Sequence, residues 1–169
     1  ILSYLFHLKT LMTRKGGLLA TVVEEFWLPL QYPTTSQQIL DVLKTGRRRD
    51  EFILLVSQSP EDAIASPILP AILQQTPTKI YLPNPDAEYK TPDGGGYYRF
   101  GLSLKEFQKL KNLGLQSRKF LVKQGSQSSV AKLDLNGMGD DIAVLAMSAE
   151  DFKYLDAAQL EAGNHPDAW

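Results

Sequence analysis

Short apolar runs alternate with stretches of helical periodicity through the first half of this chain. Residues 18–23, 52–56 and 78–82 have the length and character of strands, and the run at 52–56 is continuous enough for a strand buried on both faces. Apolar residues recur at helical spacing in 1–12, 39–46 and 66–73. Alternating strands and helices predict an α/β fold with a mainly parallel sheet flanked by helices.

Polar residues mark where several of these helices begin. Thr34-Thr35-Ser36, followed by Gln37 and Gln38, predicts a capping box for the second helix, which Gly46 would end. Ser59-Pro60-Glu61-Asp62 places a cap, a proline and two acids at the start of a further helix directly after the strand at 52–56.

The second half of the chain has a different pattern. Residues 83–98 contain three prolines and Gly94-Gly95-Gly96, which predicts a mobile loop. A capping box at Ser103–Glu106 opens a helix, and strands at 119–123 and 130–135, joined through Gly125, predict a hairpin at the sheet edge. A short helix is expected at 142–145 and a C-terminal helix over 148–163.

Composition excludes several classes of chemistry. With no cysteine, the chain cannot form a disulfide, a zinc-thiolate site or a thiol nucleophile. His7 and His165 lie near opposite ends, so neither a histidine metal cluster nor a Ser-His-Asp triad is expected. The 18 basic and 19 acidic residues nearly balance, so bulk charge favours no nucleic-acid binding, and no apolar run is long enough to span a bilayer.

Two adjacent carboxylates, Glu24 and Glu25, follow the first apolar run and precede Phe26 and Trp27, which we expect to anchor the loop in the core. An apolar strand that ends at two acids is typical of a Walker B element, in which one acid holds Mg²⁺ and the other prepares a water to attack a γ-phosphate. Gln58 ends the run at 52–56. If the two strands are neighbours, the glutamine and the acids share one crevice at the carboxyl edge of the sheet. Solvated polar side chains at strand ends are the alternative interpretation.

Arg47-Arg48-Arg49 occupies the turn before the strand that leads to Gln58. Three interpretations stay open at this point. The run can be a solvated turn balanced by Asp50 and Glu51, an arginine finger that stabilises charge on a neighbouring subunit's γ-phosphate, or a contact to the DNA backbone. The glycine-rich phosphate loop GxxxxGK[ST] is not among these residues, so the sequence predicts half of an ATPase site.

Several segments together resemble one family. Val22-Val23-Glu24-Glu25-Phe26-Trp27, Leu43 to Arg49 and Ser57 to Ala63 resemble the ATPases of type IV secretion and conjugation, the CagE/TrbE family. The resemblance continues through segments 77–85, 100–103, 120–125 and 166–169, so it covers nearly the whole chain.

The resemblance implies that residues 1–169 are the C-terminal portion of a RecA-like ATPase domain, with the phosphate loop upstream of Ile1. By it, Glu25 is the catalytic glutamate, Gln58 the sensor glutamine and Arg47 the trans-acting arginine. Glu24 is the metal-side acid, where the family usually has aspartate, so its carboxylate reaches about one bond further. ATP and Mg²⁺ are the implied cofactors, neither held tightly by the fragment.

The resemblance also implies an assembly. The parent would be a hexamer at the cytoplasmic face of the bacterial inner membrane, in peripheral contact with it, and would work with other type IV secretion components in pilus assembly and in DNA or protein export. We expect the chain alone to be inactive as an ATPase. The alternatives are a nonenzymatic module that docks partners or DNA, and a DNA-translocating ATPase of the FtsK/HerA kind.

Overall fold

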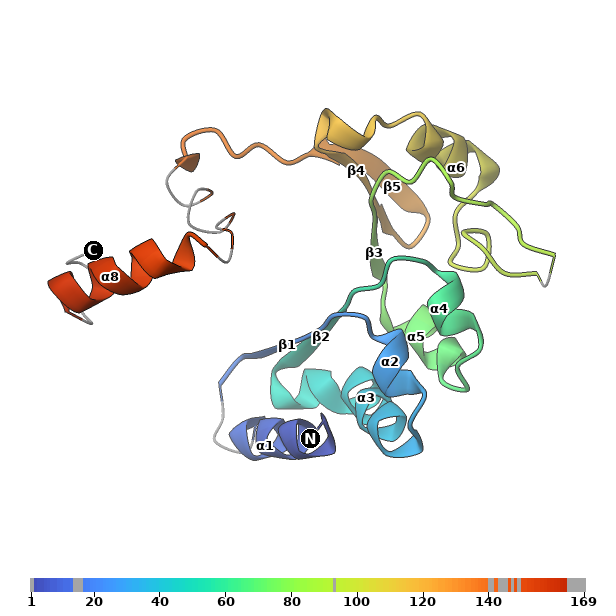
Figure 1. Cartoon of the computed structure of the whole chain (residues 1–169). Coiled ribbons are helices and arrows are strands. Elements are labelled where there is room, and N and C mark those ends of the chain that lie inside the picture. Colours follow the sequence, from blue (N-terminus) through green and yellow to red (C-terminus); the bar gives the residue numbers. More distant parts are fainter. Residues whose placement is uncertain are drawn as a thin grey trace. The chain divides into compact units, whose positions relative to one another are not determined.

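A computed structural model describes residues 2–13, 17–92, 94–139, 142, 146, 148 and 150–163. The chain divides into two compact units, residues 1–132 and 133–169, shown in Figure 1. The first unit holds both sheets. The expected short helix at 142–145 lies largely outside the described residues, as do His165 and the segment 166–169.

The first sheet consists of two parallel strands, β1 (Leu19–Val23) and β2 (Glu51–Leu55). Their register pairs Leu19 with Glu51 and Val23 with Leu55. The crossover between them contains α2 (Trp27–Leu30), α3 (Pro33–Thr45) and the 3₁₀ turn η1 (Gly46–Arg49), as a parallel pair requires. The two strands are therefore neighbours, which is the condition under which the sequence places Glu24, Glu25 and Gln58 in one crevice.

One face of this sheet packs on helices. Apolar residues of α1 (Leu2–Thr13), α2, α3, α4 (Glu61–Ile64) and α5 (Leu69–Gln75) form a core in which Ile39 and Ala63 are fully buried. Val23, Ile53 and Leu55 pack against this core. Alternate strand residues point to opposite faces of a sheet, so these positions identify the covered face.

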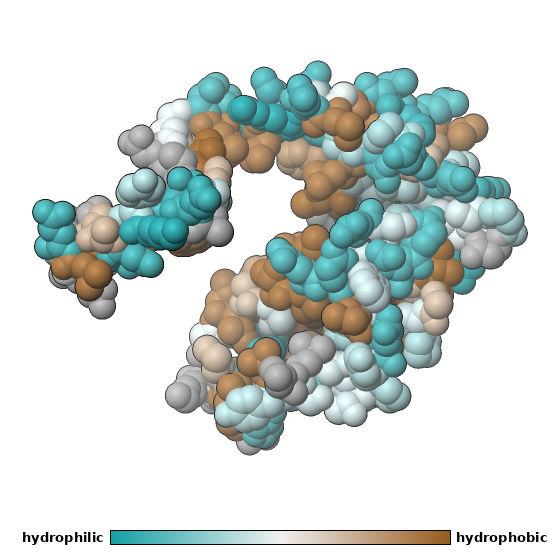
Figure 2. Space-filling view, viewed as in Figure 1, coloured by the Kyte–Doolittle hydropathy of each residue, from teal (hydrophilic) through white to brown (hydrophobic). Residues whose placement is uncertain are grey.

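The other face of the sheet is exposed, which corrects the expectation that the run at 52–56 is buried on both faces. Val22, Phe52, Leu54 and Val56 are between 41% and 58% exposed, and apolar surface is visible over this strand pair in Figure 2. Parallel strands are normally covered on both sides, and their continuous apolar runs reflect that. The apolar pattern of β1 and β2 is thus typical of strands covered on both faces, but the described residues cover only one face.

The second sheet is antiparallel and contains β3 (Thr78–Tyr81), β4 (Lys119–Gln124) and β5 (Gln127–Lys132), in that order. The sequence assigned β3 to the parallel sheet. It pairs with β4 instead, so the described strands form a mixed α/β structure and not a mainly parallel one. The predicted hairpin is confirmed, with β5 at the sheet edge. Strand β5 begins earlier than the expected residue 130, because Gly125, at a φ of 57°, turns the chain back at once. A RecA-like arrangement stays a prediction.

A second core lies against this sheet. Leu110 of α6 (Leu104–Lys111) and Leu121 of β4 are almost completely buried in it. The predicted capping box is confirmed, since the Ser103 side chain accepts from Glu106 N and the Glu106 carboxylate accepts from Ser103 N. The 3₁₀ turn η2 (Leu115–Ser117) connects α6 to β4.

The loop at 83–98 is anchored to this second core. Tyr97 is buried and its ring lies 5.6 Å from that of Phe107, while Tyr98 N donates to Tyr89 O at 2.9 Å. Gly96 has a φ of 78°, and a Cβ there would lie 2.8 Å from Tyr89 O, so this turn requires glycine. Tyr97 therefore packs the loop against the second core, and the mobility of the loop stays a prediction.

Two helices begin elsewhere than their polar residues suggested. Helix α3 begins at Pro33, and Thr35 and Ser36 are buried within it. The Thr35 hydroxyl donates to Pro29 O and makes no cap. Proline fits the first helical position better than the interior, which is why the helix starts there. Helix α5 begins after the expected Ser66-Pro67.

The second unit contains α8 (Phe152–Ala162), which lies within the expected C-terminal helix. Ser148 N and Oγ both donate to Asp151 Oδ2, at 2.8 Å and 2.6 Å, and Gly163 follows the last turn with a φ of 77°. Across the described part of the chain, no helix combines the length and apolar character needed to cross a bilayer.

Candidate functional site

The site is built where β1 and β2 end. Val56 N donates to Val23 O at 2.9 Å, and Phe26 N donates to Val56 O at 3.1 Å. These bonds continue the parallel ladder beyond the last strand residues. The segment after β1 therefore stays beside the segment after β2, and this brings the predicted acids and Gln58 to the same edge of the sheet.

Glu25 stands in a tight turn with a left-handed backbone, at a φ of 46°. Leu28 N donates to Glu25 O at 2.9 Å, and the buried ring of Phe26 anchors the turn in the core, as the sequence indicated. Few residues other than glycine adopt this conformation, and it costs on the order of 1 kcal/mol. The surrounding bonds maintain it and fix the direction of the Glu25 side chain.

Both carboxylate oxygens of Glu25 accept a hydrogen bond. Gln58 Nε2 donates to Oε1 at 2.6 Å, and Trp27 Nε1 donates to Oε2 at 2.7 Å. Both donors are neutral, so the carboxylate is oriented without a cation that would neutralise it. A fixed, half-buried carboxylate can accept a proton from a water or bind a cation.

The loop that carries Gln58 is tied to the short helix α4. The Ser57 and Ser59 hydroxyls donate to Asp62 and Glu61, and Ser59 N donates to Asp62 Oδ2 at 3.2 Å. The structure begins α4 at Glu61, and the helix has only one turn. These contacts hold the backbone on both sides of Gln58, whose exposed side chain bridges to Glu25.

Glu24 is exposed, and in the described part of the chain its side chain makes no hydrogen bond or ion pair. No group of three or more His, Asp or Glu side chains that could hold a metal is found among the described residues. Magnesium is commonly held by one or two carboxylates together with substrate phosphates and water. A single exposed carboxylate next to Glu25 fits that donor set.

Arg47 does not join Glu25 and Gln58. It is exposed on η1, which precedes β2, whereas the acids follow β1. The two ends are separated by the length of a five-residue strand, which is about 16 Å at 3.3 Å per residue. One Arg47 guanidinium therefore cannot contact a group that Glu25 and Gln58 hold in the same chain.

The sequence indicated neither the Trp27 donor nor the buried carboxylate of Glu51. The side chain of Glu51 has 0% exposure and forms an ion pair with Lys9 of α1. Thr21 Oγ1 also donates to Glu51 Oε1, at 3.1 Å. Trp27 could have been found because it lies two positions after Glu25. Nothing in the sequence distinguishes Glu51 from an ordinary charged residue before a strand.

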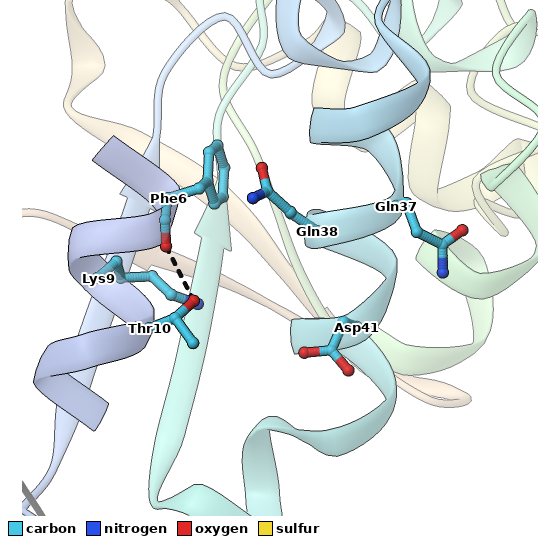
Figure 3. A pocket seen from close by; sticks show the side chains of 6 residues that line it. All are labelled: Phe6, Lys9, Thr10, Gln37, Gln38 and Asp41. Carbon is cyan, nitrogen blue, oxygen red and sulfur yellow. Dashed lines mark hydrogen bonds between the residues drawn. The ribbon is translucent and has the colours of Figure 1, made fainter. Parts of the chain in front are cut away.

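A hollow of about 330 Å³ lies between α1 and α3, and Figure 3 shows the six side chains that line it. Two of them are engaged in ion pairs, Lys9 with Glu51 and Asp41 with Arg49. Thr10 Oγ1 donates to Phe6 O at 2.9 Å. Lys9 and Asp41 therefore serve the contacts of the two helices with β2 and η1, whereas Gln38 Oε1 is buried without a hydrogen-bond partner among the described residues.

Comparison with known proteins shows relatives along the whole chain. A type IV secretion system protein VirB4 from Bartonella henselae is 37% identical over 171 residues, which is 100% of this chain and 21% of the relative. A VirB4 protein of Brucella suis is 35% identical over 125 residues, 74% of this chain and 15% of the relative. The type IV secretion system protein PtlC of Bordetella pertussis is 29% identical over 170 residues, 100% of this chain and 20% of the relative.

The match includes the segment from Glu24 to Gln58, because the alignments to the Bartonella and Bordetella proteins cover the entire chain. The chain spans about a fifth of the length of these curated relatives. No family model matches it. On the strength of the VirB4 relatives, the chain belongs to the VirB4 family of type IV secretion system proteins.

Proposed function

We propose that this chain is a C-terminal part of a VirB4-type motor ATPase, and that Glu25 and Gln58 prepare the water that attacks the γ-phosphate of ATP. The bond from Gln58 Nε2 to Glu25 Oε1, formed at the carboxyl ends of two parallel strands, is the observation that supports this most directly. Ligands of open α/β sheets gather at that edge. The names of the relatives support a role in secretion.

The chemistry follows from the orientation of Glu25. Its carboxylate accepts from two neutral donors, which orient it to take a proton from a water as that water attacks phosphorus. The Gln58 amide donates through Nε2 to Glu25, which leaves its oxygen available to accept from the same water. Trp27 holds the second carboxylate oxygen and prevents the side chain from rotating away.

Mg²⁺ and ATP complete the proposed site. Glu24 would hold Mg²⁺ through its exposed carboxylate, and the ion would neutralise charge on the phosphate oxygens. The phosphate loop would come from another part of the parent protein, since these residues contain no GxxxxGK[ST] motif. The isolated chain is therefore expected to bind ATP weakly and not to hydrolyse it.

Arg47 would act on a neighbouring subunit. It lies at the opposite end of the strands from Glu25, so it can reach the γ-phosphate of another copy in a ring but not that of its own. We therefore propose a homo-oligomer, a hexamer in the parent protein. Other type IV secretion components would be its partners, at the cytoplasmic face of the inner membrane.

The test uses the full-length parent protein. Glu25→Gln should lower the rate of ATP hydrolysis by about 10²- to 10⁴-fold and leave the Kd for ATP unchanged, because the amide cannot accept the proton. Glu88→Gln is the matched control, an exposed glutamate on the 83–98 loop. Undiminished hydrolysis by Glu25→Gln would refute the assignment of the base.

Mixed rings test the trans arginine. Arg47→Ala and Glu25→Gln proteins should each be inactive alone, but in a 1:1 mixture about one quarter of the interfaces join an intact Glu25 to an intact Arg47. Turnover should therefore recover to roughly a quarter of the wild-type rate. Rings that are shown to be mixed and yet stay inactive would exclude action in trans.

A docking module is the second candidate, and the exposure of Arg47 and Arg48 favours it. It predicts that secretion survives Glu25→Gln and fails when the arginines of η1 are neutralised. Turnover that rises on addition of DNA would favour the DNA-translocating alternative.

A further inference from the structure

The three arginines of η1 differ in their surroundings. Arg47 and Arg48 are exposed and form no ion pair among the described residues, whereas the side chain of Arg49 is 32% exposed and has two acidic partners. A run of like charges on a short turn would normally be a mobile, solvated set. Here one member of the run is held in place and the other two extend from the same turn.

Arg49 connects α3 to β2. Its Nη2 lies 2.9 Å from Asp41 Oδ2 and 3.5 Å from Glu51 Oε2. The planar guanidinium is suited to contacting two carboxylates at once, which a lysine ammonium does less well. The Glu51 carboxylate is itself fixed, since its other oxygen accepts from Lys9 of α1 and from Thr21 of β1.

The backbone of η1 is held as firmly as the Arg49 side chain. A Cβ at Gly46 would lie 2.8 Å from Glu51 O, so the turn approaches β2 more closely than a larger residue permits. Asp50 ends the turn with a φ of 51°, its N–H bonds to Gly46 O, and Leu19 N of β1 donates to Asp50 O at 3.0 Å. The turn is therefore fixed at both ends.

We propose that Arg49 is a positioning residue, whose guanidinium, held between Asp41 and Glu51, fixes η1 so that Arg47 and Arg48 are presented together to the polyphosphate of ATP on a neighbouring copy. This rests on the proposed function, and it adds Arg48 as a second contact to the phosphates. Two arginines on one rigid turn lose less backbone freedom on binding than two arginines on a mobile turn.

A mutant cycle in the full-length protein tests the positioning role. Arg49→Gln should lower kcat for ATP by roughly 10- to 100-fold through misplacement of the other arginines, with KM unchanged. In a protein that already carries Arg48→Ala, Arg49→Gln should cause a smaller loss than in the wild type, because only one arginine remains to be positioned. An equal loss in both backgrounds would overturn the proposal.

Amide hydrogen exchange gives a readout that does not depend on ATP. Arg49→Gln and Asp41→Asn should both accelerate exchange at residues 46–50, and Asp41 is exposed, so its substitution carries little risk for folding. Lys44→Gln, at an exposed position of the same helix end, is the control and should leave exchange unchanged. Unchanged exchange in Arg49→Gln would overturn the proposal that Arg49 fixes η1. Faster exchange in Arg49→Gln together with full activity of Arg47→Ala would refute only the role of Arg47 in ATP hydrolysis.

Discussion

The ion pair between Glu106 and Lys123 offers a quantitative test of the second core. Lys123 Nζ lies 2.8 Å and 2.9 Å from the two carboxylate oxygens of Glu106, and Ser103 N and Oγ donate to Oε2 at 2.7 Å and 2.8 Å. Glu106 thus joins the first turn of α6 to the central strand β4. Glu106→Gln removes the charge and keeps the shape of the side chain.

The contribution of this ion pair to the free energy of unfolding follows from the pKa of Glu106. Burial alone would raise it, but the bonds from Lys123, Ser103 and Ser128 outweigh burial and lower it from 4.5 to about 2. At 1.36 kcal/mol per unit, this difference corresponds to about 3 kcal/mol of stability. Because the folded-state pKa is the lower one, this contribution is complete above the unfolded value of 4.5 and is lost as the pH falls through about 2.

Urea unfolding of wild type and Glu106→Gln at several pH values measures this contribution. The variant should be less stable by about 3 kcal/mol at pH 7, and the difference should shrink steadily below pH 4.5. Glu88→Gln is the control, since it replaces an exposed glutamate. A difference between wild type and Glu106→Gln that stays constant from pH 7 to pH 3 would refute the linkage.

Two further substitutions test other parts of the first unit. Gly46→Ala should destabilise the fold by about 1–3 kcal/mol in urea unfolding, because its Cβ would meet Glu51 O at 2.8 Å. Gly114→Ala is the control and should be nearly neutral, because a Cβ there meets nothing closer than 3.9 Å. Trp27→Phe keeps an aromatic side chain, although a smaller one, and removes the indole N–H that donates to Glu25 Oε2. Under the proposed function it should lower kcat about tenfold with little change in the Kd for ATP. An unchanged kcat would remove Trp27 from the site.

Local signals predicted part of the local structure in this chain, although the capping box expected at Thr34–Ser36 is not formed. The capping box at Ser103 and the hairpin through Gly125 depend on residues close in sequence, and both are confirmed. Pairing between distant segments was harder. The run at 78–82 also has the pattern of a strand, and nothing in it shows that it pairs with β4, because the partner of a strand is decided by long-range packing.

The candidate site also combines contacts that the sequence predicts with contacts that it does not. The contact between Glu25 and Gln58 could be anticipated, because the carboxyl ends of parallel neighbours meet at one edge. The Trp27 donor depends on the left-handed backbone at Glu25, which no sequence pattern announces in a residue other than glycine. The burial of Glu51 depends on two segments distant in sequence, carrying Lys9 and Thr21, together with Arg49 of the turn just before it.

Glu25 and Arg47 stand at opposite ends of one short sheet, and under the proposed function this has a consequence for kinetics. Each subunit would contribute Glu25 to one ATP site and Arg47 to the next. A monomer would therefore have no complete site, and a closed ring would have one complete site at each interface. Below the concentration at which subunits associate, ATP turnover per molecule would increase with protein concentration. Because η1 and the carboxyl end of β1 lie at opposite ends of the sheet, the rate of ATP hydrolysis would then be second order in protein concentration.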